Sequence, residues 1–138
     1  MQHIAELGKR SLGKILSGKR KVEPLFQRKP DLPLRSVIEN DVIFLKSTDG
    51  YAIAKACVKK VEHFDGLEPD AAMEIIDRYK DDISPDELMM SKDIYSPFAT
   101  LLWLDNVQEI KPFRVMVPPD TTNPRWISVT DVTKLRAF

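Results

Sequence analysis

The sequence predicts an α+β fold, a small mixed β-barrel of about six strands with short helices in its connections. Short apolar runs separated by turn residues lie at hairpin distances, whereas a βαβ sheet would carry a helix after each strand. A chain of 138 residues with 43% hydrophobic content is large enough for a self-sufficient core. We therefore expect a single domain over residues 1–138.

The first half of the chain predicts strands around one short helix. Ser11 is a good N-cap for a helix carrying Leu12, Ile15 and Leu16, and Gly18 ends it because glycine enters the left-handed conformation without steric cost. The strands are expected at residues 4–7, 22–26, 42–45 and 51–61.

Local signals indicate how these strands lie in the sheet. Pro24 has no N–H for a ladder, so its strand is expected at an edge or a bulge. The Asp-Gly pair at 49–50 predicts a hairpin between the third and fourth strands. In the fourth strand, the even positions 52–58 form a face of small residues.

The second half predicts two helices and three strands. Asp70–Tyr79 has apolar residues at helical spacing on one face. Ser84 is expected to begin a further helix, with Pro85 at the first position and Glu87 completing a capping box. The last strands are expected at residues 99–107, 112–117 and 125–129.

The cysteine content and the apolar runs bear on the compartment. Cys57 is the single cysteine, which excludes an internal disulfide and suits a reducing compartment. No apolar run is long enough to span a bilayer, and the N-terminus has no apolar signal core. We expect a cytoplasmic protein with no membrane segment.

Charge is unevenly distributed, although the formal net charge is +0. Residues 1–30 hold eight Lys or Arg and two Glu, a net +6, whereas residues 62–93 hold three Lys or Arg and eleven Asp or Glu, a net −8. One interpretation is a basic face for a polyanion, with the acidic segment turned away. The other is that both segments are solvated, or that they pair in a head-to-tail homodimer or with a protein partner.

The sequence contains no motif that indicates a metal or cofactor site. His3 and His63 lie far apart, and no HxxxH or CxxC spacing occurs. Cys57 lies in the middle of a strand, where cysteine is usually an inert small hydrophobe. There is no Gly-rich phosphate loop. We expect no metal and no cofactor.

The stretch after Gly18 is the candidate site. Lys19, Arg20 and Lys21 could bind phosphates, and Glu23 makes sense among these cations if it accepts a hydrogen bond from a base edge. The alternative is a surface ion pair of Glu23 with Arg20 or Lys21, which would contribute about 0–1 kcal/mol.

Aromatic residues could add stacking faces to such a site. Tyr95 and Trp126 are candidates for stacking on a base, and for both the alternative is a place in the core. Trp103 is expected in the core.

From about residue 4 to 129 the layout resembles an ASCH domain of the PUA-like superfamily of β-barrels. The resemblance rests on GKRKVE at 18–23, NDVIFLK at 40–46, GYAIAKACVKKV at 50–61 and FATLLWLDNV at 98–107. In the family signature GxKxxExR, Gly18 and Glu23 match, Arg20 replaces the lysine, and Leu25 replaces the arginine.

The resemblance implies recognition of RNA or a modified nucleobase in a cleft beside this junction. Some similar small proteins are amidohydrolases of acylated cytidine that use a lysine, a threonine and a glutamate, and ribonuclease activity is also proposed for the family. The lysine would fall at Arg20 and the threonine at Glu23. Arginine stays protonated and cannot serve as a base or nucleophile.

The leading hypothesis is therefore a module that binds RNA or a nucleoside. Lys19, Arg20 and Lys21 would neutralise phosphate, Glu23 would read a base edge, Lys46 would flank the cleft, and Tyr95 or Trp126 would stack. On this hypothesis, alanine at Arg20 or Glu23 abolishes binding without lowering the melting temperature. The alternative is a nucleoside amidohydrolase or ribonuclease with Glu23 as its catalytic general acid or base.

Overall fold

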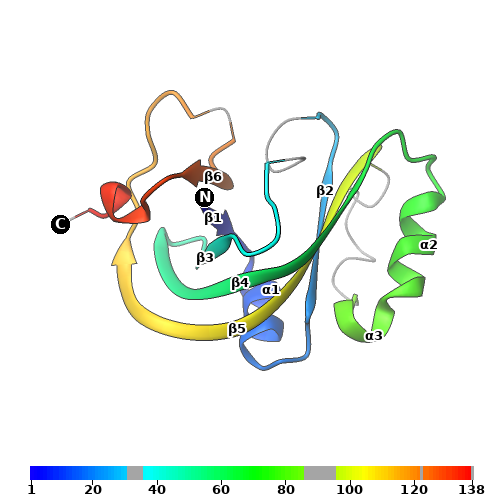
Figure 1. Cartoon of the computed structure of the whole chain (residues 1–138), viewed down its shortest axis with the longest axis horizontal. Helices are drawn as coiled ribbons and strands as arrows, with labels where there is room; N and C mark the ends of the chain where they lie inside the picture. Colours follow the sequence, from blue (N-terminus) through cyan, green and yellow to red (C-terminus); the bar gives the residue numbers. More distant parts are fainter. Residues whose placement is uncertain (31–35, 86–95, 122, 138) are drawn as a thin grey trace.

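A six-stranded mixed sheet curled into a half-barrel organises the chain (Figure 1). The computed structural model describes residues 1–30, 36–85, 96–121 and 123–137. The strand order is β2-β5-β4-β3-β1-β6, with β1 and β3 parallel and the other neighbours antiparallel. The predicted α+β fold is thus confirmed. The strands are β1 (Gln2–Glu6), β2 (Val22–Gln27), β3 (Val42–Lys46), β4 (Tyr51–Phe64), β5 (Phe98–Arg114) and β6 (Trp126–Val129).

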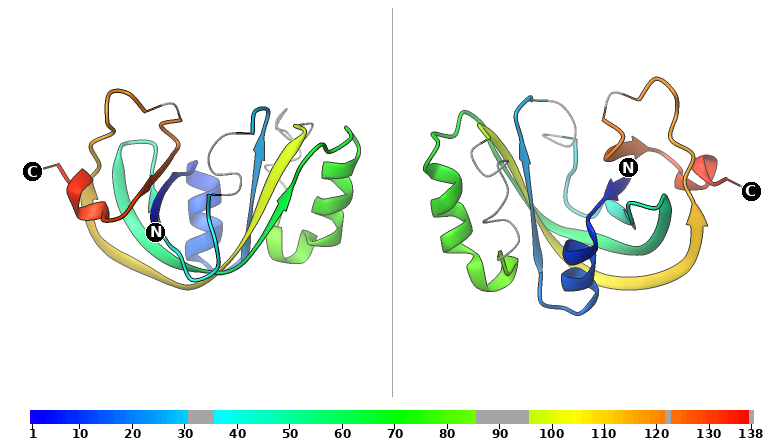
Figure 2. Two further views of the ribbon diagram at one scale, coloured as in Figure 1. Left: turned by 45° about the horizontal axis from the view of Figure 1, so that its top comes forward. Right: turned by 180° about the vertical axis from the view of Figure 1, so that it is seen from behind.

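Short helices cover both faces of this sheet. Figure 2 shows α1 lying within the opening of the U that β4 and β5 form, and its Leu12 and Ile15 join the core cluster that also contains Leu45 and Leu102. On the other side, α2 and α3 contribute to a smaller cluster. No helix in the described ranges is long and apolar enough to cross a membrane. The helices are α1 (Lys9–Leu16), α2 (Ala71–Arg78), α3 (Lys80–Ile83) and a 3-10 helix (Val132–Leu135).

The two long strands β4 and β5 differ in one respect from the expected pattern. The even positions 52–58 of β4 are buried, as predicted. The segments 99–107 and 112–117, however, were expected as two strands, and the single strand β5 contains all of the first and residues 112–114 of the second. Pro112 does not interrupt β5 because it falls where the pairing register with β4 shifts, between Ala52 and Ala54, so its missing N–H breaks no ladder bond.

The structure tests several predictions about turns and helix ends. Pro24 lies on β2, an edge strand as expected, and Gly50 closes the predicted hairpin with φ +97°. The N-cap prediction is wrong: α1 begins at Lys9 after Gly8, and Ser11 lies inside the first turn. Ser84 is the C-cap residue of α3, and the helix expected after it falls at 86–95, outside the described residues.

Gly18 and Gly13 provide a matched test of the α1 boundary. Gly18 has φ +82°, Gly13 lies within the helix, and a Cβ would meet no atom within 4 Å at either position. Gly18→Ala should therefore lower the free energy of unfolding by about 1–2 kcal/mol through backbone strain alone. Gly13→Ala should raise it by about 0.5–1 kcal/mol. Urea denaturation of both variants checks this, and equal effects would contradict the assigned helix end.

Candidate functional site

The junction between α1 and β2 has a fixed backbone. Gly18 turns the chain out of the helix. The N–H of Lys21 then donates to the carbonyl of Asp82 at 2.7 Å, and the carbonyl of Lys21 accepts from the N–H of Leu104 at 3.0 Å. The junction is therefore tied on both sides before β2 begins, which fixes the direction of its side chains.

Arg20 points inward from this junction and is only 2% exposed. Its Nε donates to the carbonyl of Ile83 at 2.7 Å, and Nη2 donates to the carbonyl of Ser84 at 3.2 Å. Its Nη1 donates to Ser11 Oγ at 2.9 Å and to Glu23 Oε2 at 3.1 Å. The last carbonyls of a helix lack intrahelical partners, so the guanidinium satisfies the end of α3 while linking it to α1 and β2.

The Arg20–Glu23 ion pair is therefore buried, unlike the surface pair considered from the sequence. Glu23 is 5% exposed, and the two residues are three apart at the start of β2. A buried charge that loses its partner costs far more than a broken surface pair. The pair thus joins three elements of the fold, and neither partner presents a largely exposed charge.

Lys19 and Lys21 differ from Arg20 in direction. Both side chains are exposed, one on either side of the inward-pointing arginine. Because the backbone between them is fixed, both side chains leave the junction toward solvent. Of the described residues that the sequence proposed for the site, Lys19 and Lys21 have charged side chains that solvent can reach.

Lys46 lies elsewhere in the sheet, at the irregular end of β3. Its side chain is 4% exposed, and its Nζ forms an ion pair with Glu6 Oε1 at 3.3 Å. Its carbonyl also accepts from the N–H of Leu7. Lys46 therefore holds the chain as it leaves β1.

The two aromatic candidates have different outcomes. Trp126 is 3% exposed within the main core cluster, so stacking on a base would require its ring to leave this position. Tyr95 lies outside the described residues.

A buried polar chain that sequence reasoning missed joins β1, β6 and the start of β3. His3 Nε2 lies 2.8 Å from Asp41 Oδ2, and His3 Nδ1 lies 2.7 Å from Ser128 Oγ. An ionised carboxylate only accepts, so Nε2 carries the proton and Nδ1 accepts from the serine hydroxyl. Trp126 Nε1 donates to Ser128 Oγ at 3.2 Å, and the N–H of Ile38 donates to Asp41 Oδ2 at 3.1 Å.

The environment of this chain shifts two pKa values. Burial lowers the pKa of His3 below its ordinary 6.5, and the hydrogen bond and charge of Asp41 oppose this only in part. Burial raises the pKa of Asp41, but hydrogen bonds from His3 and from the N–H of Ile38 outweigh it, so the net pKa is below 3.8. The imidazole is 0% exposed, so the chain holds strands together instead of facing a ligand.

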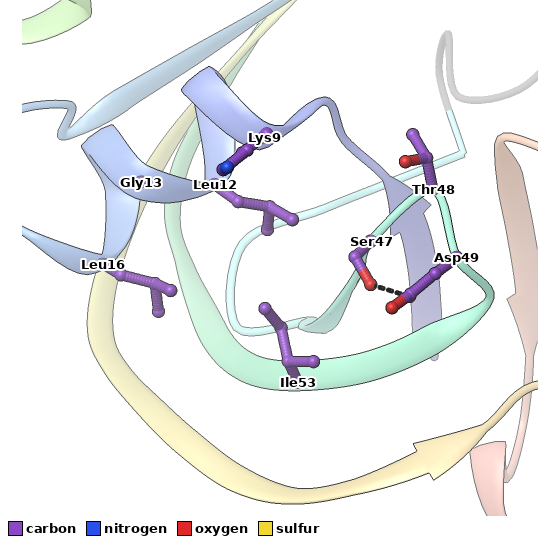
Figure 3. A pocket seen from close by; sticks show the side chains of 8 residues that line it. All are labelled: Lys9, Leu12, Gly13, Leu16, Ser47, Thr48, Asp49 and Ile53. Atoms are coloured by element: carbon purple, nitrogen blue, oxygen red, sulfur yellow. Dashed lines mark hydrogen bonds between the residues drawn. The ribbon is translucent and has the colours of Figure 1, made fainter.

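A cavity of about 390 Å³ lies along α1 (Figure 3). Its apolar floor is formed by Leu12, Leu16 and Ile53, which point toward one another. Lys9 and the β3–β4 hairpin, residues 47–49, form its polar rim. Across the described ranges, no group of three or more His, Cys, Asp or Glu residues could hold a metal ion.

Comparison with known proteins identifies the fold. No protein-family model matches the sequence, and no curated protein matches it. The crystal structure of ASCH from Zymomonas mobilis aligns with a TM-score of 0.62 and 18% identity over 99% of this chain and 96% of that chain. Its serine-to-alanine variant aligns at 0.68, also with 18% identity, over 99% and 96%. Its tyrosine-to-phenylalanine variant aligns at 0.67, again with 18% identity, over 99% of both chains.

The half-barrel with a helix in its opening is therefore a PUA-like fold. More narrowly, the chain has the fold of the ASCH domains, as the resemblance in its sequence predicts.

The burial of Arg20 changes the expected outcome of its substitution. Arg20→Met should lower the free energy of unfolding by about 3–5 kcal/mol, because the buried carboxylate of Glu23 loses its ion pair with Arg20. The double variant Arg20→Met/Glu23→Leu should recover part of this loss. Urea denaturation measures the free energy of unfolding of both variants. The control is Lys59→Ala at an exposed position of β4, for which this free energy should stay within about 0.5 kcal/mol of the wild-type value. An unchanged midpoint for Arg20→Met would refute the structural role.

His3 should make the fold less stable in acid. Its pKa is lower in the folded than in the unfolded chain, so below about pH 6.5 the unfolded chain binds a proton that the folded chain does not. Stability should therefore fall as the pH falls below that value, and Asp41 adds a further loss below its ordinary pKa. Melting temperatures between about pH 8 and 5 check the sign.

Removal of the His3 imidazole supplies the control. His3→Gln should flatten the pH dependence in this window, because the unfolded chain then no longer gains a proton at this position. Stability that rises in acid would mean that His3 is protonated in the fold and paired with Asp41 as an ion pair.

Proposed function

We propose that this chain is a module that binds RNA or a modified nucleoside beside the helix-to-strand junction. The proposal rests on which charged side chains of residues 1–30 are paired and which are exposed. Both acids of this segment are paired with a buried cation, Glu23 with Arg20 and Glu6 with Lys46. Six of its eight cations are exposed, namely Lys9, Arg10, Lys19, Lys21, Arg28 and Lys29.

Pairing of the acids leaves the surface of this segment cationic, although the whole chain is neutral. Phosphate groups are the natural counterpart of such a surface, and neutralising them supplies sequence-independent affinity for nucleic acid. The ASCH fold is compatible with this partner. In the proposal Lys19 and Lys21 contact phosphate, and Arg20 and Glu23 hold the two lysines in place. The predicted base contact of Glu23 would come from a carboxylate that Arg20 already orients.

Removing the two exposed lysines tests the proposal. Lys19→Ala/Lys21→Ala should weaken binding to pooled single-stranded RNA by on the order of tenfold at low salt. The slope of log affinity against log salt should shrink by about 1.4, or about 0.7 for each lost phosphate contact. Because both side chains are exposed, the melting temperature should not change.

The matched control removes two exposed lysines of β4, Lys55→Ala/Lys59→Ala, with the same change in net charge. Equal losses in both double variants would show nonspecific attraction without a site. The same preparations, incubated with acylated cytidines and short RNAs, test hydrolysis. Turnover that disappears in Glu23→Gln would replace the binding function with an enzymatic one.

A further inference from the structure

A second candidate surface lies where β5 ends and the C-terminal 3-10 helix folds back beside it. An open cavity of about 470 Å³ is lined there by Tyr51, Pro112, Phe113, Arg114, Arg136 and Ala137. Figure 1 shows this end of β5 at the opposite extremity of the molecule from α2 and α3. None of the sequence-derived site residues belongs to this lining.

The backbone around the cavity is fixed by long-range pairing. Val115 and Arg136 form an antiparallel bridge, and the N–H of Ala137 donates to the carbonyl of Arg114 at 2.8 Å. Arg114 also lies opposite Tyr51 across β5 and β4. Two arginines and a tyrosine from three separate segments are therefore held around one hollow.

An aromatic platform forms part of the wall. Phe113 packs edge-on against Phe44, with ring centroids 6.2 Å apart, and the guanidinium of Arg136 lies 5.6 Å from the centre of the Phe113 ring. Tyr51 is 40% exposed, a large accessible area for an aromatic side chain. Aromatic rings and guanidinium planes are the surfaces on which unstacked bases are held.

The charged side chains of the described residues that line the cavity are both cationic. Arg114 and Arg136 are exposed, no ion pair joins either to another described residue, and no carboxylate side chain of the described residues lines the hollow. The neighbouring Asp49 is turned to its own hairpin, where Oδ1 accepts from Ser47 Oγ and from the N–H of Tyr51. Two guanidinium groups beside the exposed ring of Tyr51 match a nucleotide, because arginine binds phosphate in bidentate fashion and also stacks.

We propose that this cavity is a second RNA contact, which takes one unstacked nucleotide of a single strand. The base would stack on Tyr51, and Arg114 and Arg136 would bind the adjoining phosphate. This inference rests on the proposed RNA binding at the junction and makes the ligand a polymer. An acidic peptide would use the arginines but would leave the exposed ring without a role.

The β3–β4 hairpin connects this cavity to α1. Residues 47–49 form the rim of the cavity along α1, and Tyr51 begins the lining of the second cavity. Thr48 also lines a smaller cavity with Arg125. A single RNA chain that contacts both the helix-to-strand junction and the second cavity gains affinity, because its second contact is intramolecular. A long RNA should therefore bind more tightly than a short one.

Fluorescence anisotropy with single-stranded RNAs of about three and about fifteen nucleotides tests this. Arg114→Gln/Arg136→Gln should weaken binding of the long RNA by about tenfold or more and leave the short RNA unchanged. Tyr51→Ala should act in the same direction, and Tyr51→Phe should retain binding because the ring remains. Arg78→Gln/Lys80→Gln on α2 and α3 removes the same charge from exposed positions and should change neither affinity. Melting temperatures of all variants establish that each is folded.

Three outcomes would overturn the inference. Suppose that Lys19→Ala/Lys21→Ala weakens binding of both RNAs, whereas Arg114→Gln/Arg136→Gln weakens binding of neither. The junction is then the binding site, and the proposal of a second contact is wrong. If neither double variant changes RNA binding, the proposed function itself fails. If a poly-glutamate peptide binds at the arginines and the long RNA does not compete with it, the surface serves a protein partner.

Discussion

The buried ion pair of Arg20 with Glu23 is the interaction on which the arrangement of the junction depends. One guanidinium satisfies the carbonyls of Ile83 and Ser84, a hydroxyl of α1 and a carboxylate of β2. Because arginine does not deprotonate in proteins, the donor side of these contacts is always charged. Burial makes the pair costly to break, so the helix, the edge strand and α3 are held in one relation.

This arrangement changes how the cationic N-terminal segment is understood. Three neighbouring cations have two different roles, because Arg20 is buried whereas Lys19 and Lys21 are exposed. The inward residue fixes the backbone, and the outward residues carry accessible charge. Arginine suits the inward task, because its planar fork can donate to several carbonyl and carboxylate oxygens at once.

A second buried polar system stabilises the opposite side of the half-barrel. His3 joins a carboxylate at the start of β3 to a hydroxyl on β6, and all three groups have hydrogen-bond partners. In a low-dielectric interior such a chain is stable only when each member is satisfied, so it specifies the register of β1 against both neighbours. Acid sensitivity follows from the same burial.

The sequence by itself determined the class of fold, most strand positions and the location of the basic junction. Alternation, the Asp-Gly turn and Gly18 are local signals, and local signals survive without tertiary information. Only the tertiary structure decided which cations face solvent, because Arg20 meets Ile83 and Ser84 across more than sixty intervening residues. The cavity at Arg114 and Arg136 likewise depends on pairing between segments distant in the chain. Periodicity states which residues share a face, but not which distant backbone atoms will satisfy a buried charge.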